Sequence, residues 1–188
     1  ADRMCDMGFI PDIRRIIKLL PSKRQTLCFA ATMPEDIRRL TKKILKDPVR
    51  IQVGQISPTK SVSHALYPVP NTLKKSLLFA VLEQTPTGRV LIFTRTKYRA
   101  RNLAKDLAKR GYHAEALQGN MTQNKRQRAI DGFRGNKYDI LVATDVASRG
   151  IDVLDISHVI NYDVPDTTDT YTHRIGRTGR ADRTGEAF

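Results

Sequence analysis

Residues 139–152 read Asp-Ile-Leu-Val-Ala-Thr-Asp-Val-Ala-Ser-Arg-Gly-Ile-Asp, and this segment indicates the architecture of the chain. The apolar run at its start is short and does not alternate with polar residues, which is typical of a strand covered on both faces. Small and polar residues follow directly. In sheets of parallel strands, ligands bind at the carboxyl ends of the strands, so this turn is a candidate binding loop.

The neighbouring segments continue the pattern of one strand after one helix. The predicted strands are residues 90–93, 114–117, 139–143 and 158–162. The predicted helices are residues 73–82, a long basic helix that stops at Gly111, and residues 125–133. Alternating helices and strands predict an α/β fold, in which a parallel sheet carries helices on both faces.

The first part of the chain has its own pattern of apolar residues. A helix ends near Pro21, a strand is predicted over 26–30, a second helix begins at Pro34, and a second strand is predicted over 49–53. Residues 54–71 are rich in Gly, Ser and Pro, which is typical of a linker, with room for one edge strand. We therefore expect a first domain segment over 1–53, a linker over 54–71 and a second domain over 72–188.

Charge points to a polyanionic partner. The 188 residues include 33 Lys and Arg against 19 Asp and Glu, a net charge of +14. Residues 95–128 hold ten basic and two acidic side chains, whereas residues 131–170 hold three and eight. A basic face beside an acidic one suits nucleic acid first and an acidic membrane surface second. The alternative is an ordinary solvated surface.

Other classes of protein are disfavoured by the composition. No apolar run is long enough to span a bilayer. Cys5 and Cys28 lack CxxC spacing, which argues against a zinc site or a disulfide and fits a reducing cytosol. We expect a cytoplasmic protein.

Residues 171–180, Tyr-Thr-His-Arg-Ile-Gly-Arg-Thr-Gly-Arg, form the most specific cluster. Its three arginines recur every three residues, and on a helix or turn this spacing directs them to roughly one side. A guanidinium is planar and always charged, so it suits phosphate. The interleaved glycines would let a ligand approach the backbone. A solvated basic helix is the alternative.

Two further clusters follow predicted strands. Asp152 could accept hydrogen bonds from a ribose, or could simply hold a turn. Gly119 could allow a phosphodiester backbone to approach, and Arg126 could bind phosphate near a helix N-terminus that Thr122 caps.

Together these segments resemble the DEAD-box RNA helicases over essentially the whole chain. Residues 173–180 are similar to motif VI, 143–152 to motif V and 90–97 to motif IV, while Gln123 and Arg126 match the QxxR element. Ala1-Asp2 matches the end of the DEAD sequence itself. Among these proteins, the bacterial RhlE-type group is the most similar.

The resemblance implies a RecA-like helicase C-terminal domain, truncated near its last strand and preceded by part of a first RecA-like domain. ATP and Mg²⁺ would bind between the two in the intact protein, and RNA would be bound through its backbone. Arg177 and Arg180 would be arginine fingers, and Gly150 and Asp152 would line the nucleotide pocket. The implied RNA contacts are Thr94, Arg95, Gly119, Arg126 and Thr144; the implied coupling residues are Asp2, Ala30, Thr32, His173 and Arg174.

The implied activity is ATP-dependent local unwinding of RNA duplexes. The sequence contains no GxxxxGK[ST] phosphate loop, and we predict no metal ligand in it. We therefore expect negligible ATP hydrolysis without the missing N-terminal RecA-like domain. Alternatives are a non-catalytic RNA-binding module on the same fold and a translocase that acts on DNA.

Ala30 departs from the family pattern, in which a Ser-Ala-Thr motif stands where this chain has Ala30-Ala31-Thr32. The missing hydroxyl removes one donor and one acceptor, which predicts weaker coupling of ATP turnover to strand separation. In the intact protein, Ala30→Ser should raise the number of duplexes unwound per ATP hydrolysed. An unchanged ratio would refute this prediction.

Overall fold

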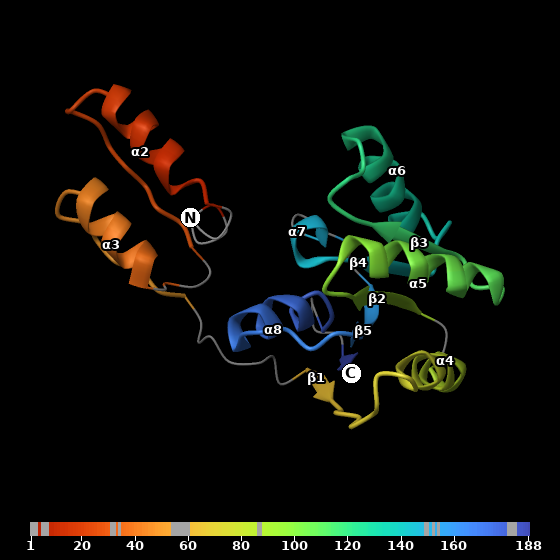
Figure 1. The fold of residues 1–188 in the computed structure, drawn as a ribbon. Coiled ribbons are helices and arrows are strands. Elements are labelled where there is room, and N and C mark those ends of the chain that lie inside the picture. Colours follow the sequence, from red (N-terminus) through yellow and green to blue (C-terminus); the bar gives the residue numbers. More distant parts are fainter. Residues whose placement is uncertain are drawn as a thin grey trace. The chain divides into compact units, whose positions relative to one another are not determined.

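The computed structural model describes residues 4, 8–30, 33, 35–53, 61–85, 88–148, 151, 153, 155–179 and 184–188. The chain divides into two compact units, residues 1–56 and 57–188. Most of the predicted candidate site lies in the second unit, which holds one sheet and the helices packed on it (Figure 1).

The second unit is built on a parallel sheet. Its described strands run in the order β1-β6-β5-β2-β4-β3, and every pair is parallel. Central strands β2 and β4 are buried along nearly their whole length, as their continuous apolar sequences predict. The bounds are β1 (Val62–His64), β2 (Arg89–Phe93), β3 (Ala114–Leu117), β4 (Ile140–Ala143), β5 (Ile156–Asn161) and β6 (Gly185–Ala187).

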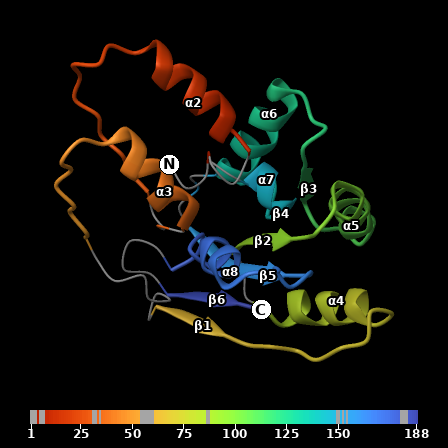
Figure 2. The same ribbon diagram turned by 60° about the vertical axis from the view of Figure 1, so that its left-hand side comes forward.

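Helices cover both faces of this sheet, so the predicted fold class is confirmed (Figures 1 and 2). On one face α4 (Lys74–Gln84) and α5 (Lys97–Lys109) pack Phe79 and Leu107 against strand residues such as Ile92. On the other, α6 (Gln123–Arg134) and α7 (Asp145–Ser148) pack against Phe93 and its neighbours. Helix α8 (Thr168–Ile175) packs on the β1–β6 edge.

Threonine hydroxyls fix where three of these helices begin. The side chain of Thr96 accepts a hydrogen bond from the Arg99 N–H at 3.2 Å, and Thr122 accepts from Lys125 at 3.4 Å. Thr167 caps α8 in the same way. Gly111 follows α5 with a φ of +90°, a left-handed conformation that favours glycine, so the predicted stop of this helix is confirmed.

Strand β1 lies inside the range 54–71, where composition predicted a linker with room for an edge strand. Val62 is buried, and β1 pairs with β6 near the end of the chain. The Ser61 hydroxyl donates to the carbonyl of Gly179 at 3.0 Å. Residues 61–64 are therefore part of the second unit's sheet.

The first unit contains α2 (Ile10–Leu19) and α3 (Glu35–Ile44) among its described residues. The strands predicted over 26–30 and 49–53 are wrong for this structure, because both segments are without strand pairing. Their apolar side chains are exposed, as shown by Leu27, Phe29, Val49 and Ile51. A strand requires a hydrogen-bonded neighbour, and the local pattern alone cannot supply one.

No helix in the described ranges is both long and apolar enough to cross a membrane.

His158 makes the stability of the second unit depend on pH. This β5 side chain is buried, with Nδ1 2.7 Å from the Ser157 hydroxyl and Nε2 3.3 Å from Glu186. Burial lowers the pKa of His158 below its ordinary 6.5, and the Glu186 carboxylate only partly opposes this. His158 therefore binds a proton more readily in the unfolded chain than in the folded chain. The stability that neutral His158 contributes is present above pH 6.5 and is lost as the pH falls through the folded-state pKa.

We expect His158→Gln to flatten the pH dependence of the free energy of unfolding between about pH 8 and about pH 5. Urea unfolding at both pH values measures this. The matched control is His113→Gln, which changes an exposed histidine and should flatten the pH dependence less than His158→Gln does. Equal slopes for all three proteins would contradict the role of His158.

Candidate nucleic-acid and phosphate site

Because the sheet is parallel, the loops that leave its strands meet at one edge. Strand β2 lies between β4 and β5, and backbone hydrogen bonds continue past the strand ends. The Thr94 N–H donates to the Ala143 carbonyl at 2.9 Å, and the Asp163 N–H donates to the Phe93 carbonyl at 3.2 Å. The polar clusters that sequence placed after separate strands are therefore neighbours here.

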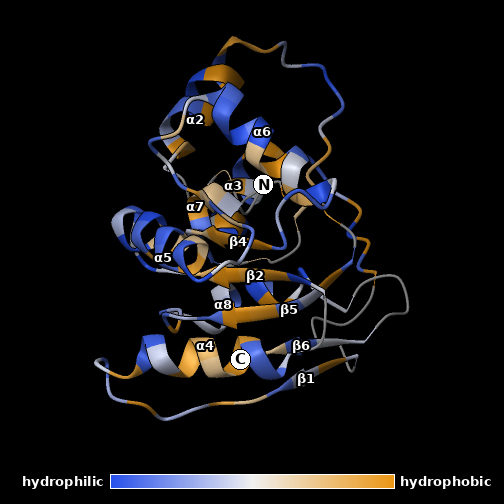
Figure 3. Cartoon of the chain, turned by 90° about the vertical axis from the view of Figure 1, so that its right-hand side faces the viewer, coloured by the Kyte–Doolittle hydropathy of each residue, from blue (hydrophilic) through white to orange (hydrophobic). Residues whose placement is uncertain are grey.

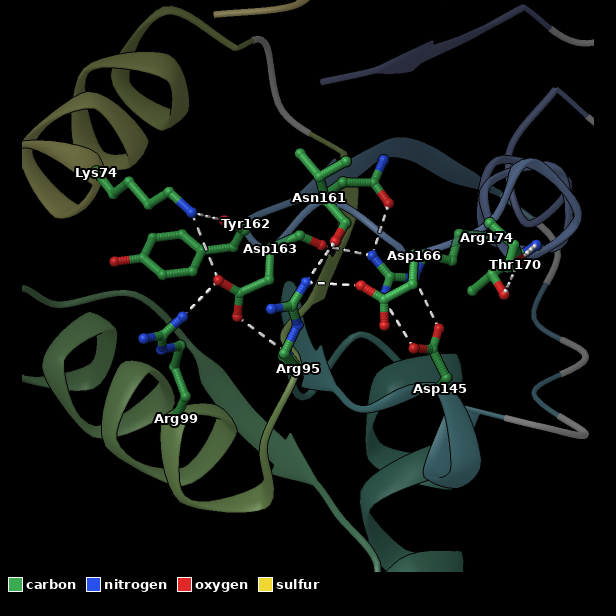
Figure 4. A network of polar contacts seen from close by, with 12 residues as sticks. Lys74, Arg95, Arg99, Asp145, Asn161, Tyr162, Asp163, Asp166, Thr170 and Arg174 are labelled. Carbon is green, nitrogen blue, oxygen red and sulfur yellow. Dashed lines mark hydrogen bonds and ion pairs between the residues drawn. The ribbon is translucent and has the colours of Figure 1, made fainter. Parts of the chain in front are cut away.

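Arg174 connects the loops at this edge through hydrogen bonds to several of them (Figure 4). It is only 3% exposed, and its guanidinium binds the Asp145 carboxylate with two hydrogen bonds, Nε to Oδ1 at 2.7 Å and Nη2 to Oδ2 at 2.8 Å. Its Nη1 donates to Asn161 Oδ1 at 3.1 Å and to the Asp163 carbonyl at 2.7 Å. The guanidinium also lies 4.9 Å from the centre of the Phe93 ring. A bidentate pair with a buried guanidinium fixes α8 to the ends of β4 and β5.

Asp163 is a second organising residue, and the sequence reasoning missed it. Its carboxylate accepts the backbone N–H of Arg95 at 2.9 Å, lies 3.5 Å from Lys74 Nζ, and forms a short ion pair with Arg99 (Figure 4). Its position just after β5 could have revealed it, because the loops that leave the carboxyl ends of the strands form this edge. The sequence reasoning also missed Asn161, which lies at the end of the same strand.

Asp163→Asn should lower the free energy of unfolding by about 2–3 kcal/mol. A neutral amide cannot pair with the charged side chains of Lys74 and Arg99 as the buried carboxylate does. Urea unfolding of the chain measures this. Asp166→Asn is the matched control: Asp166 pairs with Arg95 at 2.8 Å, but its side chain is 83% exposed, so we expect a loss below about 1 kcal/mol. Equal losses for the two variants would contradict the central position of Asp163.

Arg95 is the accessible cation of the edge. Its side chain is 62% exposed, and its Nη2 donates to Asp166 and, at 3.4 Å, to the Val164 carbonyl. An exposed pair of this kind is weak, so the guanidinium can exchange Asp166 for a phosphate. Thr94, in contrast, is fully buried, and its hydroxyl donates to the Thr96 carbonyl at 3.3 Å. Thr94 therefore shapes the turn that presents Arg95.

The loop after β3 lies open beside this turn. Gly119 is exposed, and a side chain placed there would meet no atom within 4 Å, so packing within the chain does not require glycine. Lys97 Nζ donates to the Asn120 side chain at 3.1 Å, which joins the loops after β2 and β3. Thr144 is half-buried after β4, and Arg126 is half-buried in the first turn of α6.

Two of the arginines of residues 171–180 lie on different elements, and Arg180 lies outside the described residues. Helix α8 ends at Ile175, so Arg174 is helical and Arg177 lies in the turn that follows. Arg177 is 8% exposed, and its Nη1 donates to the Ile151 carbonyl at 2.8 Å. Gly179 has a φ of +66°, and a side chain there would come within 2.6 Å of Val62. Packing on β1 therefore already requires this glycine.

The remaining predicted residues fall into two groups. His173 is half-buried on α8 beside Arg174, and Ala30 is half-buried in the first unit. Outside the described residues lie Asp2, Thr32, Gly150, Asp152 and Arg180.

A parallel sheet whose carboxyl edge carries buried and exposed arginines defines the class of the second unit: it is a RecA-like helicase C-terminal domain. The family model "Helicase conserved C-terminal domain" matches residues 71–182, and "DEAD/DEAH box helicase" matches residues 1–40. The chain belongs to the DEAD-box RNA helicase family.

Individual relatives agree with this assignment. The chain is 43% identical over 189 residues to the DEAD-box ATP-dependent RNA helicase RhpA of Helicobacter pylori, covering 100% of this chain and 38% of that protein. It is 43% identical over 180 residues to the RNA helicase CrhR of Synechocystis, covering 95% and 37%. The structure of S. cerevisiae Dbp5 bound to RNA and ADP BeF3 matches with a TM-score of 0.81 at 30% identity, covering 96% of this chain and 48% of that one. The chain thus spans less than two fifths of the two bacterial relatives and about half of the Dbp5 chain.

Proposed function

We propose that the intact protein is an ATP-dependent RNA helicase that separates short RNA duplexes, and that this chain supplies its RNA-backbone and arginine side. The observation that carries the proposal is the single edge at which Arg174 and Asp163 hold the loops after β2, β4 and β5. At such an edge, the loops after β2, β4 and β5 can contact one ligand together. The named relatives are RNA helicases, and one structural neighbour is bound to RNA.

RNA would be bound through its phosphates and sugars. Arg95 offers an exposed guanidinium, and Gly119 leaves space beside the backbone of its loop. Thr144 and Arg126 would add contacts from the loop after β4 and from α6, and Thr94 would contribute through the turn it shapes. Contacts of these types carry no base information, so binding should tolerate sequence.

ATP with Mg²⁺ would be held between this domain and the N-terminal RecA-like domain. Arg177 and Arg180 would contact the γ-phosphate, because a guanidinium suits phosphate, and Gly150 and Asp152 would line the ribose pocket. ATP hydrolysis supplies the free energy for strand separation. His173 and Arg174 would transmit the nucleotide state to RNA, because Arg174 is bonded to Asp145, the neighbour of Thr144.

Residues 1–53 would complete the first RecA-like domain. Residues 54–71 would connect it to the second domain, and residues 62–64 of this segment also add an edge strand to the second domain's sheet. The exposed apolar segments over 26–30 and 49–53 suit strands that pair with the rest of that domain. In this domain Asp2, Ala30 and Thr32 would couple hydrolysis to unwinding. We further infer membership of the RhlE-type group and a cytoplasmic location.

Strand-displacement assays on the intact protein test the proposal. A short RNA duplex should separate only when ATP is present, whereas a DNA duplex of the same sequence should not. Separation of the DNA duplex would favour a DNA translocase. RNA binding with no separation at any ATP concentration would favour a non-catalytic module on a helicase fold.

A further inference from the structure

Helix α5 carries a row of cations with a spacing of four residues: Lys97, Arg101, Lys105 and Lys109. Residues four apart are neighbours on a helix surface, so these side chains form one slowly turning stripe. With a rise of about 1.5 Å per residue, the α5 cationic stripe is about 18 Å long. Figure 3 shows hydrophilic colour over most of this helix, in contrast to the hydrophobic strands beneath it.

The exposed cations of the stripe, Arg101, Lys105 and Lys109, form no ion pair within the described residues. Lys109 has only a weak Coulombic interaction with Asp106. Asp106 is the sole acid of α5, and it is bound to Lys75 of α4 at 2.6 Å. This bond raises the pKa of Lys75 and lowers the pKa of Asp106. The Asp106 carboxylate is therefore paired with Lys75 of α4 and not with a cation of the stripe.

An ordinary solvated helix mixes charges of both signs along its exposed face, because like charges four residues apart repel each other. Helix α5 places three such like-charged pairs in succession. This arrangement destabilises the free domain slightly, and a bound polyanion would remove the cost. The stripe therefore indicates a ligand with regularly spaced negative charges.

The stripe begins at the proposed RNA edge. Lys97 is two residues after Arg95, and its ammonium donates to Asn120 in the loop after β3. From there α5 runs back along the sheet, away from the carboxyl ends of the strands. A strand bound across Arg95 and Gly119 could continue along the helix without a break.

We propose that the α5 cationic stripe binds the phosphates of RNA that flanks the segment held at the carboxyl edge. The inference rests on the proposed function and extends it: the stripe adds a second, sequence-independent contact region that lengthens the RNA footprint. It takes no part in ATP hydrolysis.

The test uses the intact protein with Arg101, Lys105 and Lys109 all changed to Gln, which has a similar helix propensity and leaves α5 intact. Two single-stranded RNAs are compared, one just long enough to saturate ATPase stimulation and one extended at both ends. The variant should bind the extended RNA about tenfold more weakly than the unaltered protein, with a salt slope smaller by about 2. Affinity for the short RNA should be unchanged.

The matched control changes Arg14, Lys18 and Lys23 of the first unit to Gln, which removes the same net charge from exposed positions. An equal loss in the control would overturn the proposal in favour of a general charge effect, as would unchanged binding in the stripe variant. Loss of binding to phosphatidylglycerol vesicles alone, with extended-RNA binding retained, would overturn it in favour of a membrane surface. If the unaltered protein fails to bind even the short RNA, the proposed function is what fails.

Discussion

Replacing Arg177 with Ala in the intact protein should lower RNA-stimulated ATP turnover by about a thousandfold or more, the effect typical of losing an arginine finger. The guanidinium would stabilise the charge that develops on the transferred phosphoryl group. RNA binding should persist, because the Arg177 guanidinium donates to the Ile151 carbonyl and is not among the proposed RNA contacts. Steady-state turnover with saturating RNA measures the effect.

Structural damage must be separated from lost chemistry in this experiment, because Arg177 is largely buried. Arg177→Lys keeps the positive charge but loses the planar fork, so turnover should remain low while the thermal unfolding midpoint stays near that of the unaltered protein. Turnover within about tenfold of normal in a folded Arg177→Ala variant would rule out a finger role.

Replacing Arg174 with Ala should lower the free energy of unfolding of the second unit by about 2–4 kcal/mol, because the buried guanidinium is the donor for Asn161 and the Asp163 carbonyl as well as the bidentate partner of the partly exposed Asp145. The loss is large beside a total stability of about 5–15 kcal/mol. It should therefore be visible as a lower urea midpoint for the part of the transition that reports on this unit.

A double-mutant cycle with Asp145→Asn isolates the pair. The two single changes should not add, and the coupling energy should be about 2 kcal/mol or more. Arg174→Lys should recover only part of the stability, since an ammonium cannot make both bonds to Asp145 together with those to Asn161 and Asp163. A loss below about 1 kcal/mol for Arg174→Ala would contradict the connecting role of Arg174.

The strands and helices of the second unit were predictable because their signals are local. The continuous apolar runs at 90–93 and 140–143 are short enough to favour buried strands, and Thr122 and Gly111 mark helix ends by their own chemistry. Strands that depend on distant partners were harder. Residues 62–64 become a strand by pairing with 185–187, whereas 26–30 and 49–53 have the right composition and no pairing.

The site was predictable in part for the same reason. Polar residues after strands revealed Gly119 and the segment that holds Thr144, because a parallel sheet gathers such loops at one edge, whereas Arg95 followed only from the family resemblance. The bonding pattern was not predictable: sequence gives no sign that Arg174 would be buried against Asp145, or that Asp163 would hold Arg95 from 68 residues away. Side-chain networks of this kind depend on three-dimensional contacts between loops.

ATP turnover by the intact protein, measured with and without single-stranded RNA, decides whether this chain is part of an RNA-dependent ATPase. We predict turnover that RNA stimulates, as required if the edge that gathers Arg95 and Arg174 completes an RNA-dependent ATPase. Absent turnover in a protein that still binds RNA, with an affinity that falls steeply with salt, would contradict the claim and identify an RNA-binding module on a helicase fold.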